Sequence, residues 1–138
     1  MNWSVDLPKS GQIVRTKVSF YYHYGIFVDE NEIIQFGLPD DVGKPANEIK
    51  VLATDIYTFL NGGILESGVP TKEELKKIRK PQEIIKTARS RIGEGGYDIL
   101  HNNCEHFVNE CVFGKSQSSF LDDVRDKIRQ KLMNNKQF

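Results

Sequence analysis

The sequence predicts an α+β fold in which a small antiparallel sheet packs against helices. Residues 11–36 alternate apolar and polar side chains with the period of strands, whereas residues 71–133 repeat their apolar side chains with the period of helices. A chain of 138 residues, 38% of them hydrophobic and 28% charged, is typical of an ordinary soluble globular protein. We therefore expect a single domain over residues 1–138.

The clearest strand signals lie near the N-terminus. Residues 11–20 alternate as a half-exposed strand does, and residues 22–28 are aromatic and β-branched, as expected of a buried strand. The "DEN" turn at 29–31 leads into "EIIQF" at 32–36. These features predict a hairpin that joins two neighbouring strands.

The segments around this hairpin are less regular. Gly, Pro and Asp residues indicate a loop at 37–47, and short strands are expected at 48–52 and 56–60. The segment 96–100 reads as an extended link. The stretch 38–80 is the expected source of the substrate-side loops, because loops on a rigid scaffold carry specificity.

Helix signals dominate the second half. Thr71 followed by Glu74 is a capping-box pattern and predicts a helix over 71–80. Pro81 then starts a new helix, which we expect to end at Gly93.

Two further helices are expected towards the C-terminus. Asn102 or Asn103 is a good N-cap for a helix over 104–113 that ends at Gly114. A last amphipathic helix is predicted over 118–133. Its apolar stripe consists of Phe120, Leu121, Val124, Ile128 and Leu132.

The net charge of zero gives no reason to expect nucleic acid as a partner. Charge is nevertheless uneven: residues 29–55 carry seven acids and two bases (−5), and residues 71–91 carry eight bases and three acids (+5). The basic segment fits a solvated helix face, and the alternative is a weak, transient contact with anionic lipid headgroups.

The sequence favours a cytoplasmic location. Residues 1–12 contain Asp6 and lack an apolar core, which argues against a signal peptide. No stretch reaches the roughly 18 apolar residues that a membrane span requires.

The segment "ILHNNCEHFVNEC" at 99–111 concentrates histidine, cysteine and glutamate. Cys104 and Cys111 on one helix would lie about 10 Å apart, beyond the limit of about 7 Å for a disulfide. Cys104 and His106 would point to different helix faces, and a second pair of zinc ligands is missing, so we expect no metal. Cys111 fits a small core residue, and His106 fits a packing or supporting residue better than a base.

Cys104 is the candidate nucleophile because it starts a helix, where free N–H groups stabilise a thiolate. A nucleophilic thiol requires an imidazole and an orienting polar group. His23 lies on the apolar strand, and Gln35 on the next strand can face it across the hairpin, subject to register. From the residues alone, a buried core cysteine and an exposed strand glutamine stay open as alternatives.

The order and spacing of two blocks identify a family. "GQIVRTKVSFYYHYGIFV" (11–28) followed by "NNCEHFVNECVFG" (102–114) resembles the lecithin:retinol acyltransferase-like (NC-domain) family, with a match reaching roughly from Gly11 to Arg125. The resemblance implies a circularly permuted papain-like fold, here similar to soluble bacterial members. It places the nucleophile on Cys104, the base on His23 and the third polar position on Gln35, which is often histidine in the animal enzymes. Tyr21 and Asn103 fall at oxyanion or supporting positions.

The resemblance implies covalent acyl transfer or hydrolysis without a cofactor, with an acyl-donor lipid or a thioester as the partner. Two alternatives stay open: a papain-like peptidase or amidase, and a catalytically silent interaction module. The sequence leaves the acceptor and the oligomeric state undetermined.

Overall fold

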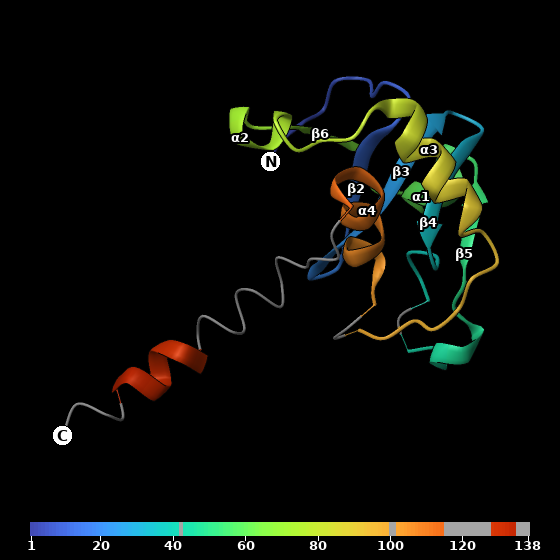
Figure 1. Cartoon of the computed structure of the whole chain (residues 1–138). Helices are drawn as coiled ribbons and strands as arrows, with labels where there is room; N and C mark the ends of the chain where they lie inside the picture. Colours follow the sequence, from blue (N-terminus) through green and yellow to red (C-terminus); the bar gives the residue numbers. More distant parts are fainter. Residues whose placement is uncertain (42, 100–101, 115–127, 135–138) are drawn as a thin grey trace.

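A six-stranded antiparallel sheet forms the centre of the molecule (Figure 1). The structure is a computed structural model and describes residues 1–41, 43–99, 102–114 and 128–134. The strands follow the spatial order β1-β6-β2-β3-β4-β5. Their bounds are β1 (Asn2–Ser4), β2 (Gln12–Val18), β3 (Tyr21–Asp29), β4 (Glu32–Phe36), β5 (Val51–Thr54) and β6 (Glu66–Val69).

The predicted hairpin is confirmed and extends into a three-stranded meander. β2 pairs with β3, and β3 pairs with β4 after the turn at 29–31, where Asp29 Oδ1 accepts a hydrogen bond from the Asn31 N–H. Ser19 adopts a left-handed φ of 57° in the tighter turn between β2 and β3. The α+β class follows from this sheet and the helices on it.

Helices cover the two faces of the sheet unequally. α3 (Pro81–Ser90) and α4 (Cys104–Phe113) lie together over the face that carries Ile26 and Ile34, forming the larger core (Figure 1). On the other face, Phe59 from α1 (Ile56–Leu60) packs against Val14 and Ile33. The alternation of side chains along β2 to β4 supplies both faces with apolar residues.

The strand predicted at 56–60 is wrong, because this segment forms α1. Asp55 caps the helix by accepting the Thr58 N–H at 2.8 Å, and Asn61 ends it in a left-handed conformation. The strand predicted at 48–52 is shifted to β5, after a short 3₁₀ turn, η1 (Ala46–Glu48). Periodicity in a five-residue apolar run does not distinguish strand from helix. Here the N-cap residue Asp55 makes the segment helical.

The predicted capping box is confirmed, but the helix it starts is short. Thr71 and Glu74 cap each other around α2 (Lys72–Leu75), which ends well before residue 80. α3 starts at Pro81 as predicted, and the α-helix ends at Ser90 rather than at Gly93.

α4 has the predicted bounds, with Asn103 as its N-cap and Gly114 as its left-handed C-cap. Of the helix predicted over 118–133, positions 118–127 lie outside the described residues, including most of its apolar stripe. Residues 128–134 are helical, with Ile128 and Leu132 exposed. Among the helices that the structure describes, none is long and apolar enough to cross a bilayer.

Candidate active site

The candidate site lies where β4 separates from β3. The β3–β4 ladder ends at the pair Gly25–Gln35, so within the described part of the chain the first residues of β3 pair with β2 alone. The N-terminus of α4 packs beside them, and the Cys104 sulfur accepts a hydrogen bond from the Tyr24 N–H. Cys104 and His23, 81 positions apart in the sequence, therefore line the same cavity.

His23 is buried and hydrogen-bonded to the predicted partner. Its Nε2 lies 2.9 Å from Gln35 Oε1, and its ring contacts Phe59 with a centroid distance of 5.3 Å. Gln35 pairs with Gly25 rather than with His23, so the two side chains meet diagonally on one face of the sheet. Burial lowers the pKa of His23, although Gln35 and the Asp41 carboxylate oppose the shift, so the ring is neutral at neutral pH.

Gln35 is fully buried and has a second polar neighbour. Its Nε2 donates to Thr54 Oγ1 at 2.7 Å and lies 3.4 Å from the Ile33 carbonyl. The Thr54 hydroxyl in turn donates to the Asp55 carbonyl at 3.0 Å. Sequence reasoning missed Thr54, which enters the site only through the pairing of β5 with β4.

Cys104 begins α4 and is 8% exposed. Burial raises the pKa of its thiol to about 11, and the neighbouring Glu105 carboxylate acts in the same direction. Hydrogen bonds from the N–H groups of Tyr24 and Cys104 oppose this shift only in part. The N–H groups at the helix terminus therefore favour the thiolate as expected, but desolvation outweighs them, and the pKa of the Cys104 thiol stays above its ordinary value.

Asn103 and His106 close the N-terminus of α4. Asn103 Oδ1 accepts the N–H groups of Glu105 and His106 at 3.0 Å, while His106 Nδ1 accepts the Asn103 N–H at 3.1 Å. The Asn103 amide also donates to the Ile99 carbonyl at 2.9 Å. Asn103 thus positions Cys104, and His106 is a capping residue.

Tyr21 lines the cavity, and its hydroxyl donates to the Pro39 carbonyl at 2.8 Å. Burial raises the pKa of Tyr21, so the hydroxyl stays protonated at neutral pH. In this structure Tyr21 connects β3 to the loop that follows β4. Asp41 in the same loop is fixed by Lys44 and by the Leu38 N–H.

The cavity has a volume of about 940 Å³. Most of its lining residues are aromatic or aliphatic, and a minority are charged. His23 and Cys104 are both part of this lining. Its apolar wall includes Trp3, Ile13, Phe20, Phe36, Val108 and Phe113.

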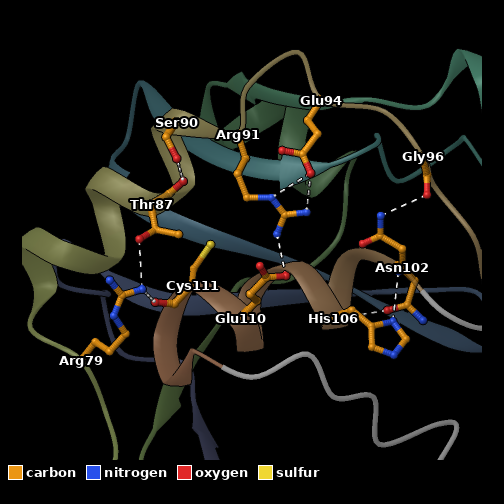
Figure 2. Close-up of polar contacts among 11 residues, drawn as sticks. Arg79, Thr87, Ser90, Arg91, Glu94, Gly96, Asn102, His106, Glu110 and Cys111 are labelled. Carbon is orange, nitrogen blue, oxygen red and sulfur yellow. Dashed lines mark hydrogen bonds and ion pairs between the residues drawn. The ribbon is translucent and has the colours of Figure 1, made fainter.

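Polar contacts between α3 and α4 fix the helix that carries Cys104 (Figure 2). Arg91, at the end of α3, forms ion pairs with Glu94 and Glu110 at 3.0 Å, and its guanidinium lies over the Phe107 ring. Arg79 donates to the Cys111 carbonyl at 3.1 Å.

Cys111 is a buried core residue, as predicted, and burial raises the pKa of its thiol to about 12. Both cysteines are free thiols. Within the described part of the chain, no three His, Cys, Asp or Glu side chains are grouped as metal ligands would be.

Comparison with known proteins identifies the family. Residues 6–117 match the family model described as lecithin retinol acyltransferase. The chain is 31% identical over 139 aligned positions to human phospholipase A and acyltransferase 3, covering 93% of this chain and 83% of that protein. It is 26% identical to human lecithin retinol acyltransferase, covering 86% of this chain and 60% of that protein. This chain therefore belongs to the lecithin retinol acyltransferase family.

Proposed function

We propose that the protein is a thiol-dependent acyltransferase or acyl hydrolase that cleaves an ester of a glycerophospholipid through an acyl-Cys104 thioester. The observation that carries the proposal is the apolar cavity, whose wall contains a free, buried thiol and the ring of His23, which is hydrogen-bonded to Gln35 behind it. The names of the relatives, phospholipase A and acyltransferase among them, support this chemistry.

The reaction begins from a neutral pair. As the Cys104 sulfur attacks the ester carbonyl carbon, His23 accepts the thiol proton, and a tetrahedral oxyanion forms. The Cys104 N–H stabilises the oxyanion, and the Tyr21 hydroxyl joins it by exchanging the Pro39 carbonyl for the oxyanion. Collapse breaks the bond to the leaving alcohol, which takes the proton from His23, and the acyl group stays on sulfur.

The second half of the reaction releases the acyl group. His23 takes a proton from water or from an acceptor hydroxyl or amine, whose oxygen or nitrogen attacks the thioester carbonyl. Collapse returns the electron pair to sulfur, and the His23 proton restores the Cys104 thiol. Gln35 is neutral and orients the imidazole without stabilising imidazolium as a carboxylate would, which fits general-base catalysis better than a resting ion pair.

The lining of the cavity favours a lipid over a peptide. A peptidase requires a groove with polar groups for an extended backbone, whereas the wall on either side of Cys104 includes Ile13, Phe36 and Val108. An acyl chain is matched by such a wall because its burial removes apolar surface from water.

We also propose that the mouth of the cavity contacts a lipid surface transiently. Phe20 is 86% exposed at the tip of the β2–β3 hairpin, and Ile99, 62% exposed, precedes α4; both line the cavity. Figure 1 shows the hairpin tip and the chain leading into α4 at the same end of the sheet. The basic segment is a weaker candidate, because Arg79, Arg89 and Arg91 are already paired with glutamates.

Vesicle binding tests this contact. Phe20→Ser is expected to weaken binding to phosphatidylcholine vesicles severalfold. Tyr57→Ser is the matched control, since Tyr57 is 82% exposed on α1, over the opposite face from α4. Equal vesicle binding by both variants and the wild type would refute the proposed contact.

Fatty-acid release from phosphatidylcholine, with and without an added amine acceptor, tests the proposed activity. Cys104→Ala is expected to abolish turnover, because nucleophile and base act as a unit. Cys111→Ala removes a thiol of the same helix from the core and is expected to stay active. Turnover by Cys104→Ala near the wild-type rate would refute the mechanism.

A further inference from the structure

We propose that Thr54 is the positioning residue that decides which nitrogen of His23 acts as the base, an inference that rests on the proposed function. A glutamine side chain has one accepting and one donating end of nearly equal size. A carboxylate in its place would accept a hydrogen bond whichever way round it lay. Gln35 must instead be held in one of two orientations, and Thr54 is the neighbour that distinguishes them.

The hydrogen bonds run in one direction. The Thr54 hydroxyl donates its proton to the Asp55 carbonyl at 3.0 Å, so its oxygen is left to accept from Gln35 at 2.7 Å. Only the NH₂ end of the amide can make that bond. The carbonyl end, Oε1, is thereby turned towards His23 at 2.9 Å.

The direction of this chain fixes the tautomer of His23. Because Gln35 Oε1 can only accept, His23 Nε2 must carry the proton. Nδ1 then holds the lone pair and is the nitrogen that can take the Cys104 proton. A reversed amide would point its NH₂ group at Nε2, favour the proton on Nδ1 and leave the base without a free lone pair.

Among the residues that the structure describes, no other strong contact fixes the amide. The Ile33 carbonyl also accepts from Gln35 Nε2, but at 3.4 Å, which is long for a hydrogen bond of this kind. Removal of the Thr54 hydroxyl therefore removes most of the preference between the two orientations. One ordinary hydrogen bond changes such an equilibrium by roughly fivefold, so its loss leaves the two orientations about equally populated, and we expect Thr54→Val to lower kcat by about twofold. KM is expected to be unchanged, because Thr54 is not among the residues that line the cavity.

The chain offers a matched control in Thr16. It is fully buried, lies directly opposite His23 in the β2–β3 pairing, and its hydroxyl has no hydrogen-bond partner among the described residues. Thr16→Val makes the same chemical change on the strand that pairs directly with His23. It removes a hydroxyl that orients nothing, so tautomer and rate are expected to stay as in the wild type.

The decisive measurement is the ¹⁵N spectrum of the His23 ring in the free protein at pH 7.5, with kcat measured in parallel. We expect an Nε2–H ring in the wild type, a mixture of tautomers in Thr54→Val, and the wild-type spectrum and rate in Thr54→Ser and Thr16→Val. A wild-type spectrum in Thr54→Val, or failure of Thr54→Ser to restore it, would overturn the inference. The spectrum requires no turnover, so a failure of the proposed activity would be seen separately, in Cys104→Ala.

Discussion

The pH dependence of alkylation at Cys104 distinguishes a neutral thiol from a preformed thiolate. Burial raises the pKa of this thiol from an ordinary value of 9.0 to about 11. Two pKa units correspond to about 3 kcal/mol of penalty on the ionised form. At pH 7 roughly one molecule in ten thousand would carry the thiolate, against about one in a hundred for an unshifted cysteine.

The assay is reaction with iodoacetamide from pH 7 to pH 10, followed by intact mass in a Cys111→Ala background so that only one thiol can react. The rate is expected to rise about tenfold per pH unit without a plateau, because the thiolate is the reactive form. The same protein unfolded in urea supplies the reference, and its rate should reach half its plateau near pH 9 and approach the plateau near pH 10. A folded-state rate that is independent of pH above about 7 would refute the reasoning.

His23→Ala sharpens this test. A neutral His23 contributes little to the resting thiolate, so the variant should keep the alkylation profile of the parent while losing turnover of the ester. If alkylation at neutral pH fell together with turnover, His23 would be holding a thiolate–imidazolium pair in the resting enzyme.

Three further predictions concern stability. Gln35→Leu leaves the buried His23 N–H without its acceptor and should lower the free energy of unfolding by about 1–3 kcal/mol in urea titrations; an unchanged midpoint would contradict the hydrogen bond. The lowered pKa of His23 makes its contribution to stability complete above pH 6.5 and progressively lost below it. His23→Ala should therefore lose less stability than the wild type between pH 7 and pH 5. Equal losses of unfolding free energy in the two proteins would contradict the lowered pKa of His23. Arg91→Met removes the ion pairs to Glu94 and Glu110 and should destabilise by roughly 1–2 kcal/mol, whereas an unchanged unfolding curve would mean that they contribute nothing.

The central sheet could be predicted from sequence where the signal is local. The β3–β4 hairpin combines an alternating pattern with a turn at 29–31, and α4 carries both an N-cap and a C-terminal glycine. β1 and β6 were not predictable in this way, because their short segments pair with partners more than 50 residues away. The strand prediction for 56–60 failed although its determinant is local. The composition of this segment suits a strand, but a single capping side chain, Asp55, makes it a helix.

In the site, too, contacts within one hairpin could be predicted and contacts between distant segments could not. The contact between His23 and Gln35 could be anticipated because both lie in one hairpin. Thr54 could not, because it reaches Gln35 only through the β4–β5 pairing. The raised pKa of Cys104 could not be predicted either, since the helix terminus is visible in the sequence whereas the burial that outweighs it is a property of the folded chain.

Intact mass after brief exposure to phosphatidylcholine or to a short-chain thioester shows whether an acyl group is transferred to Cys104. The proposed mechanism predicts a gain of one acyl group on the wild type and on Cys111→Ala, mapped to Cys104, with no gain on Cys104→Ala or His23→Ala. An adduct that persists on Cys104→Ala, or no adduct on a wild-type protein that still releases fatty acid from phosphatidylcholine, would contradict it.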